Sequence, residues 1–584
     1  MGKYKSLIVF FIFFSILFVS LGLASYLNHG MRKIGVAEIT LENDSLKISG
    51  VLYSPKMILG LTIPPIKLPG VVLIHGVMNA KETMSGIALE LARRGIFALS
   101  IDATGHGDSN GNLEESNDST LGGLAAVEYL KNLLYVDENA IGLIGHSMGA
   151  SAIRATSFLT GDINSHIFIA GGISSRYNTS IYGEFNTTNP SNLLVAIGRY
   201  DEAVAFNEVE DELKSVFGTD EDIIVNQVYG SFTNQTARKF IMPNTNHLLE
   251  PFNKEIVKAS VRWIFNSSGA TNDPFDSSAG FPSNVLYPYR DVLILIGIIG
   301  FVGLVFPLVG MGQKITFFMK RKESKEIIEP KYGLWKMGLI WGFLHLVLFV
   351  PPILLFGMGA VIIPLSLGTT AIFWILTLAI VGGILVFFIS KKRAPEKSSK
   401  NIIKGLGMNF ANWRGLILVI DIFLMLVILS LIIEIMPGIN LKMFVPLFSN
   451  FSWLRGLMFL LLVPFMFLYF SIDGLITTGM YRSSVKEESN KHKTVATLKV
   501  IAIKLLPFVL VLLIQYITLI FFDFMILPGF LGFSMQFIIM LVPLFLIYAL
   551  VTVSFYEKTR TIETGALLNA LLFAWTLSIL LPIG

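Results

Sequence analysis

Apolar residues form long runs at the N-terminus and throughout the second half of the chain. The first run extends from about Leu7 to Leu27 and follows Lys3 and Lys5. A helix needs about 20 predominantly apolar residues to cross a bilayer, so this run predicts a membrane helix within residues 1–28. Its length favours an uncleaved signal anchor over a cleaved signal peptide. About eight further spanning helices are predicted, near Val292–Val309, Leu334–Phe356, Thr370–Ile389, Leu416–Ile435, Leu454–Ile476, Val500–Phe522, Phe530–Phe555 and Ala566–Leu581.

Between these apolar regions lies a polar stretch that contains several short apolar runs. The runs Val71–Ile74, Ala140–Ile144 and Leu193–Ile197 are typical of strands buried in a parallel sheet. We therefore expect one globular domain over residues 36–266. Residues 267–289 are rich in Ser, Gly, Asn, Asp and Pro and have no periodicity, which is typical of a linker to a polytopic domain of residues 290–584.

One motif in the globular stretch indicates chemistry. Residues 145–149 read Gly-His-Ser-Met-Gly, between a strand-like run and the helix-like segment Ala150–Leu159. In this setting Gly145 and Gly149 permit a turn that is too tight for flanking side chains, and the turn lifts the Ser147 hydroxyl clear of the sheet. A serine hydroxyl is a weak nucleophile unless a base takes its proton. The motif therefore predicts a histidine and an acid further along the chain.

Both partners are present, and each follows a strand-like run. The acid candidate is Asp201 and the histidine candidate is His247. The chain order Ser147, Asp201, His247 differs from the orders in the chymotrypsin-type and subtilisin-type triads and is the one used by α/β hydrolases. Glu202 is the alternative acid if Asp201 points away.

Two backbone N–H groups are candidates for an oxyanion hole. The run Val71–Ile74 ends in His75-Gly76-Val77, and the loop after this strand would donate the N–H of Val77. The residue after the nucleophile, Met148, would donate the other. Each such donor lowers the barrier by about 3 kcal/mol.

These pieces together resemble the α/β-hydrolase superfamily, nearest its dienelactone-hydrolase-like and serine-peptidase-like branches. The matching segments are His75-Gly76, the Asp-Ala-Thr-Gly-His-Gly-Asp-Ser stretch of residues 102–109, the 145–149 elbow, residues 198–201 and Asn246-His247. The resemblance covers about residues 36–266. It implies a mostly parallel sheet with helices on both faces, joined here to an all-α transmembrane bundle. It also implies an acyl-enzyme mechanism that uses Ser147, His247 and Asp201 and requires no cofactor.

Composition agrees with a membrane protein and excludes several other classes. Of 584 residues 53% are hydrophobic, the mean hydropathy is +0.66, and there is no cysteine, so disulfides and cysteine-ligated metals are excluded. No His or carboxylate cluster has metal-ligand spacing. The net charge of +4 gives no reason to expect nucleic acid as a partner.

The distribution of basic residues predicts the orientation in the membrane. Lys and Arg cluster at Lys314–Lys331, Lys391–Lys404, Arg482–Lys499 and Lys558–Arg560. With nine spans these clusters fall on the same side as Lys3 and Lys5, which the positive-inside rule places in the cytoplasm. The expected location is thus the cell membrane, with the globular domain and the C-terminus outside the cytoplasm.

Glycosylation sequons support this orientation. They occur at Asn43, Asn117, Asn178, Asn186, Asn234 and Asn266 within or next to the globular domain, although an Asn-rich and Ser/Thr-rich domain also produces them by chance.

The resulting hypothesis is a membrane-anchored serine hydrolase that cleaves an ester-type or thioester-type acyl bond of a small-molecule, lipid-like or peptide substrate. A serine peptidase or an acyltransferase with the same triad is the alternative within the enzyme class. A transporter or receptor whose globular domain only binds ligand is the alternative outside it. The short polar segment at Gly171–Asn192 predicts at most a small lid and a fairly open site. Ionisable or polar residues within spans, namely His345, Asp421, Lys504 and Gln515, are the functional candidates of the bundle.

Overall fold

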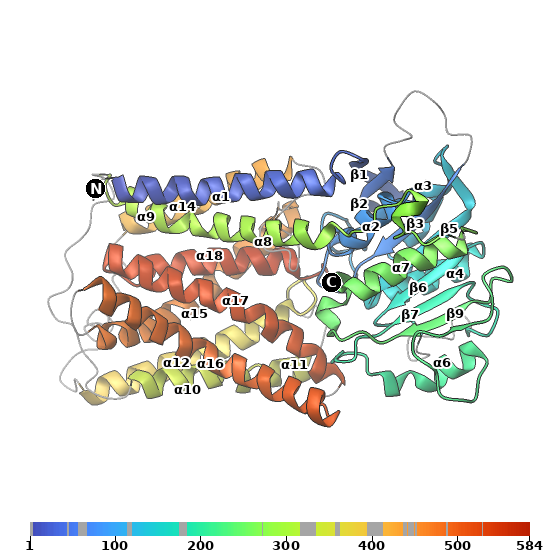
Figure 1. The fold of residues 1–584 in the computed structure, drawn as a ribbon. Helices are drawn as coiled ribbons and strands as arrows, with labels where there is room; N and C mark the ends of the chain where they lie inside the picture. Colours follow the sequence, from blue (N-terminus) through green and yellow to red (C-terminus); the bar gives the residue numbers. More distant parts are fainter. Residues whose placement is uncertain are drawn as a thin grey trace.

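The computed structural model combines a helical bundle with a domain built on a β-sheet, which lies at one end of the bundle (Figure 1). We call the second part the sheet domain. The structure describes residues 4–43, 46–55, 67–113, 119–173, 184–270, 272–315, 334–356, 362–393, 413–435, 441, 449, 452–485, 489–527 and 529–584. The N-terminus lies at the far end of the bundle and the C-terminus lies beside the sheet domain.

The described strands of this domain form one nine-stranded sheet in the order β1-β2-β4-β3-β5-β6-β7-β9-β8. The six strands from β4 to β9 in this order run parallel, and β1, β2 and β8 pair antiparallel at the two edges. The bounds are β1 Ile34–Asn43, β2 Leu46–Pro55, β3 Leu68–Ile74, β4 Phe97–Ile101, β5 Val136–His146, β6 Ser165–Ile169, β7 Leu193–Ala196, β8 Val228–Tyr229 and β9 Arg238–Ile241.

Helices cover both faces of the sheet, so the central strands are buried on both sides, as their continuous apolar runs require. The helices α3 (Gly123–Lys131), α4 (Met148–Thr160) and α6 (Glu210–Phe217) pack on one face around a core that includes Val72, Leu143 and Val195. The helices α2 (Ser85–Ala92) and α7 (Lys254–Ser267) pack on the other face. The sheet domain therefore has two separate apolar layers.

Nine helices or helix pairs within the described residues are long and apolar enough to cross a membrane. They are α1 Lys5–Asn28, α8 Tyr287–Gly303 with α9 Val305–Gly312, α10 Leu334–Val347 with α11 Val350–Phe356, α12 Gly368–Arg393, α14 Trp413–Glu434, α15 Trp453–Ser484, α16 Asn490–Phe522, α17 Gly529–Thr559 and α18 Glu563–Leu580. They match the nine segments expected from the sequence. Their length and composition indicate a membrane protein.

The first helix packs along α8, so both chain segments that lead into the sheet domain run side by side (Figure 1). Gly297 and Gly300 make this close contact possible. A Cβ atom at Gly300 would lie 2.7 Å from the backbone nitrogen of Leu17, which is closer than real Cβ contacts allow. Small residues commonly serve this purpose in membrane helix pairs.

The segment between α7 and α8 is fastened to the sheet domain although its composition is that of a linker. The guanidinium of Arg94, on the loop after α2, donates to the carbonyl oxygens of Pro274 and Pro282, each at 2.7 Å, and also to the carboxylate of Glu90. The Arg94 guanidinium lies 4.0 Å from the ring centroid of Phe275. These contacts restrain the sheet domain relative to α8.

The carboxyl ends of the parallel strands face the bundle. After β4, the carbonyl oxygen of Gly105 accepts bonds from the Ile583 N–H at 2.9 Å and from the Arg455 guanidinium at 3.1 Å. After β9, the Asn246 side chain donates to the Tyr516 hydroxyl of α16 at 2.9 Å. Ligands of open α/β sheets bind at the carboxyl ends of the strands, so the edge that holds such sites is the edge that the membrane helices cover.

Candidate active site

The turn between β5 and α4 holds Ser147 in the conformation that the motif predicts. Ser147 has φ 54° and ψ −117°, a combination rarely adopted outside glycine and often found at functional sites. A Cβ atom at Gly145 would overlap the carbonyl oxygen of Gly149, and one at Gly149 would overlap the carbonyl oxygen of Ile74 on β3. Both positions therefore require glycine, because neighbouring backbone atoms leave no room for a Cβ.

The structure brings Ser147, His247 and Asp201 into one hydrogen-bonded row. The Nε2 atom of His247 lies 2.9 Å from the Ser147 Oγ. The Nδ1 atom of the same ring lies 2.9 and 3.0 Å from the two carboxylate oxygens of Asp201. In this geometry a neutral imidazole donates its Nδ1–H to Asp201 and can accept the serine proton at Nε2.

Backbone donors fix Asp201 in place. Its Oδ1 accepts the N–H groups of Ala203 at 2.7 Å and Val204 at 2.8 Å. Burial lowers the pKa of His247, but the negative charge of Asp201 and its hydrogen bond outweigh burial, so the net shift is above the usual 6.5. The ring is thus a stronger base than an isolated histidine.

Two further carboxyl groups, those of Glu202 and Glu250, lie beside this row. The sequence motifs pointed to Glu202 but not to Glu250. Glu202, the alternative acid, faces the backbone rather than the ring, because its Oε2 accepts the His247 N–H at 3.4 Å. Glu250, on the turn after His247, accepts the Gly198 N–H at 2.5 Å and is fully buried. Sequence reasoning missed Glu250 because its place in the site depends on a contact with Gly198, 52 positions earlier in the chain.

Burial raises the pKa of Glu202 to about 7, with a further rise from the charge of Asp201. Burial and the same charge raise the pKa of Glu250 well above its usual range. Both groups therefore hold a proton more tightly than an exposed glutamate does.

A stability prediction follows from Glu202. A carboxyl group whose pKa is raised on folding binds its proton more tightly in the folded state, so stability decreases as pH rises from about 4.5 to about 7. In the wild type this decrease in the free energy of unfolding should be on the order of 2–3 kcal/mol. Glu202→Gln has no titrating group at this position, so we expect the decrease to be absent in the variant. Unfolding midpoints of both proteins at pH 5 and pH 8 test this; equal pH dependence in both would contradict it.

Of the two predicted oxyanion donors, Met148 follows Ser147 directly, and Val77 follows Gly76, where an added Cβ would lie 3.1 Å from the Ser147 Cβ. Among the residues that the structure describes, none accepts a hydrogen bond from the N–H of Val77 or of Met148, so both remain available. His75 supports the loop that carries Val77, because its Nδ1–H donates to the Gly76 carbonyl at 2.7 Å and its Nε2 accepts the Ala103 N–H at 3.1 Å. Its ring therefore has a structural function.

Other polar residues of the motifs shape loops. Asp102 is buried and accepts the backbone N–H and the ammonium group of Lys81, each at 2.7 Å. Burial, with a smaller effect from His75, lowers the pKa of His106 to about 3, so that ring stays neutral and its Nδ1 lies 3.1 Å from the Thr104 carbonyl. These contacts agree with a loop-shaping function for both residues.

One group in the described chain has ligand atoms close enough for a metal ion. His146, His247 and Glu250 present such atoms within 4.8 Å of one another, although they are far from contiguous in sequence. The Nε2 of His146 already lies 3.1 Å from the His247 carbonyl oxygen, and burial holds the pKa of the Glu250 carboxyl high. Because the Nε2 of His146 and both ring nitrogens of His247 already have hydrogen-bond partners, the group fits the hydrogen-bonded arrangement better than a metal site.

The region over the site is where the sequence predicted at most a small lid. Residues 174–183 of the expected small lid lie outside the described residues. The side chains of His247 and Asp201 are buried, and the helix α16 reaches the loop that carries His247 through Tyr516. The expectation of a fairly open site stays a prediction, and the structure adds that helix α16 contacts the loop that carries His247.

Comparison with known proteins agrees with this geometry. Residues 71–279 match the alpha/beta hydrolase family. This domain has the α/β-hydrolase fold. The predicted fold class is confirmed, and we call residues 34–267 the hydrolase domain from here on. The match does not separate the dienelactone-hydrolase-like and serine-peptidase-like branches, so that finer resemblance stays a prediction.

Solved structures similar to the hydrolase domain are distant in sequence. The esterase Pf2001 of Pyrococcus furiosus is 17% identical, with 41% of this chain and 95% of that chain covered and a TM-score of 0.31. A cold-adapted esterase from an Arctic intertidal metagenomic library is 17% identical (40% and 94% covered, TM-score 0.29). Est1E of Butyrivibrio proteoclasticus, bound to ferulic acid, is 18% identical (39% and 96% covered, TM-score 0.29). No curated protein matches the sequence.

Proposed function

We propose that the protein is a membrane-anchored serine hydrolase that cleaves an ester or thioester through an acyl-enzyme. The observation that carries this proposal is the hydrogen-bonded row of Ser147, His247 and Asp201, with contacts of 2.9 Å on both sides of the His247 ring. The N–H groups of Val77 and Met148, which have no acceptor among the described residues, complete the proposed site. A nucleophile, a base with an orienting acid and an oxyanion site are the parts that acyl transfer requires.

The geometry assigns each step to an atom. The Ser147 Oγ attacks the acyl carbonyl while its proton passes to Nε2 of His247, and the N–H groups of Val77 and Met148 hold the oxyanion. When the tetrahedral intermediate collapses, the bond to the leaving alcohol or thiol breaks and that group takes the proton from His247. Water then attacks the acyl-enzyme, gives its proton to the same ring and releases the acid, and Ser147 recovers its proton.

We place the hydrolase domain outside the cytoplasm. The N-terminus and the hydrolase domain lie at opposite ends of the bundle (Figure 1). The Lys493 ammonium at the start of α16 pairs with Glu557 near the end of α17 at 2.7 Å, so these basic segments share the end opposite to the hydrolase domain. The positive-inside rule assigns that end to the cytoplasm.

Exposure of the sequon side chains fits this orientation. Asn186 and Asn234 are exposed and Asn266 is half-buried, so Asn186 and Asn234 could carry N-glycans where the host has the machinery. Asn117 and Asn178 lie outside the described residues, and the side chain of Asn43 is not described.

The pH dependence of activity tests the proposed base. Because His247 must be neutral to accept the serine proton and its pKa is raised above 6.5, we expect kcat/KM to increase with pH through a midpoint above 6.5. The charge of Glu202 contributes to that shift, so Glu202→Gln should move the midpoint to lower pH. Steady-state rates between pH 5 and pH 9 measure both, and a midpoint that does not move would remove Glu202 from the account.

The reaction class is tested with the purified full-length protein in nanodiscs. A panel of matched esters, thioesters and amides is compared between the wild type and Asp201→Asn, which leaves the packing but removes the charge that orients His247. We expect ester and thioester hydrolysis that Asp201→Asn lowers by about 10⁴-fold. Faster cleavage of amides would favour the peptidase alternative. No turnover of any member would favour a domain that only binds ligand.

A further inference from the structure

We propose that the substrate is a long-chain acyl ester drawn from the bilayer, and that its acyl chain lies in an apolar cavity of the membrane bundle. This inference rests on the proposed function, because it names the substrate class of the same catalytic site. It depends on three observations, which concern the lining of the cavity, its place in the bundle and its apolar connection to the catalytic loops.

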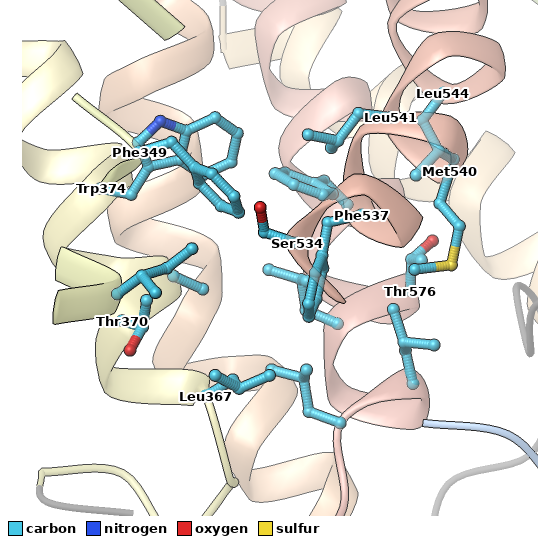
Figure 2. Close-up of a pocket in the computed structure, with 16 residues that line it drawn as sticks. Phe349, Leu367, Thr370, Trp374, Ser534, Phe537, Met540, Leu541, Leu544 and Thr576 are labelled. Carbon is cyan, nitrogen blue, oxygen red and sulfur yellow. The ribbon is translucent and has the colours of Figure 1, made fainter. Parts of the chain in front are cut away.

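The cavity lies between α11, α12, α17 and α18 and has a volume of about 60 Å³. Figure 2 shows Phe349 and Trp374 on one side and Phe537 and Leu541 on the other, with the Ser534 hydroxyl between them. The described lining contains no charged side chain.

The hydroxyl groups that line the cavity offer little to a polar ligand. The Thr576 hydroxyl donates to the Leu572 carbonyl at 3.0 Å, and the Ser534 hydroxyl donates to the carbonyl of Leu531 in its own helix. A polar or charged group that entered would lose its hydrogen bonds to water without replacement. A hydrocarbon chain loses none and gains apolar burial, so the lining selects for an alkyl chain.

The cavity is at the end of the bundle that meets the catalytic edge. Ser534 follows two residues after Gly532, where an added Cβ would overlap the backbone carbonyl oxygen of Glu202. On another wall, Leu581 precedes Ile583 by two residues, and the Ile583 N–H donates to Gly105 at 2.9 Å. Two walls of the cavity thus lie two residues from direct contacts with the hydrolase domain.

Apolar side chains connect the catalytic loops to the cavity. Met78, next to the proposed oxyanion donor Val77, belongs to the same buried apolar cluster as the lining residues Trp374 and Leu541. Leu248, next to His247, belongs to it as well, and Val77 packs against it. Both catalytic loops therefore rest on the apolar core that surrounds the cavity. An ester carbonyl at Ser147 could direct its acyl chain into this core while the polar leaving group stays on the hydrolase side.

The placement of the chain is tested with alkyl fluorophosphonates that carry a terminal diazirine, in a series from octyl to octadecyl. The phosphonate reacts with Ser147, and light then links the chain terminus to its neighbours in the full-length protein in nanodiscs. We expect one range of chain lengths to label cavity residues of α12, α17 or α18. Labelling confined to lipids or to outward-facing residues would overturn the proposal. Absence of reaction at Ser147 would instead contradict the proposed function.

Substitutions in the cavity give an independent readout. Ala371→Phe narrows the cavity and Phe537→Ala widens it, while Ile380→Phe on the outward face of α12, 59% exposed, is the matched control. Each buried methylene changes an equilibrium constant about fourfold, so losing room for about two should lower kcat/KM for dodecanoate esters about tenfold. Butyrate esters should be cleaved at the wild-type rate, and Phe537→Ala should shift the optimum to longer chains.

The control keeps the two hypotheses separate. If both cavity variants retain butyrate hydrolysis and the wild-type chain-length profile, the acyl-chain site is wrong and the hydrolase stands. If Ile380→Phe changes the profile as much as Ala371→Phe does, the effect is not specific to the cavity and the proposal also fails. If Ala371→Phe does not fold, the shift expected for Phe537→Ala decides the matter.

Discussion

Replacing Ser147 with alanine should lower kcat/KM for an ester substrate by at least about 10⁴-fold, because no other group can form the acyl-enzyme. The fold should survive, since Ser147 is half-buried and its side chain contributes one hydrogen bond, to His247 at 2.9 Å. Steady-state hydrolysis together with a thermal unfolding midpoint measures both expectations.

The loss of activity in single and double variants shows whether Ser147 and His247 act as one catalytic unit or independently. Members of one catalytic unit are strongly non-additive, so Ser147→Ala combined with His247→Ala should be about as inactive as either variant alone. A control, Ser151→Ala, removes a hydroxyl from the next turn of α4 and should keep wild-type activity. Retained activity in Ser147→Ala with loss in Ser151→Ala would place the nucleophile elsewhere.

Replacing Lys504 with methionine should destabilise the membrane bundle by about 3–5 kcal/mol, because it leaves a buried charge unpaired. The Lys504 ammonium lies 2.7 and 3.0 Å from the two carboxylate oxygens of Asp473, and both side chains are buried. The Trp341 indole N–H donates to the same carboxylate at 2.9 Å. The unfolding midpoint of Lys504→Met in detergent, compared with that of the wild type, measures the loss.

A second substitution tests whether the stability of the bundle depends on the Lys504–Asp473 pair rather than on either charge alone. Lys504→Met combined with Asp473→Asn removes both charges and keeps an acceptor for Trp341, and it should recover most of the stability lost in Lys504→Met. Unfolding midpoints of the two variants in detergent measure the recovery. A double variant that is no more stable than Lys504→Met would show that the carboxylate has another function.

The triad candidates could be predicted because their chemistry is written into local patterns. The turn at residues 145–149 requires glycine on both sides of Ser147, and each candidate follows a strand that reads as a continuous apolar run. The carboxyl ends of parallel strands meet at one edge of a sheet. Asp201 therefore comes together there with Ser147, 54 positions before it, and with His247, 46 positions after it.

The remaining features depend on contacts between distant segments that no local pattern reveals. Glu250 is a catalytic neighbour only because the loop after β9 folds back on Gly198. Lys504 was one of the intramembrane candidates, but its partner Asp473 lies on α15, and such a pairing follows from helix packing alone. Asp421, in contrast, is exposed on α14 in the structure. The contacts of α16 and α17 with the loops that carry His247 and Glu202 also come from helices at the far end of the sequence, and no local pattern could reveal them.

The most direct measurement of the central claim is the mass of the full-length protein after exposure to a membrane-impermeant fluorophosphonate on intact cells. We predict one adduct, located by peptide mapping on the segment that contains Ser147, absent in Ser147→Ala and strongly slowed in His247→Ala. Labelling only after lysis would reverse the proposed orientation while leaving the nucleophile in place. No adduct at Ser147 under either condition would contradict the serine hydrolase itself.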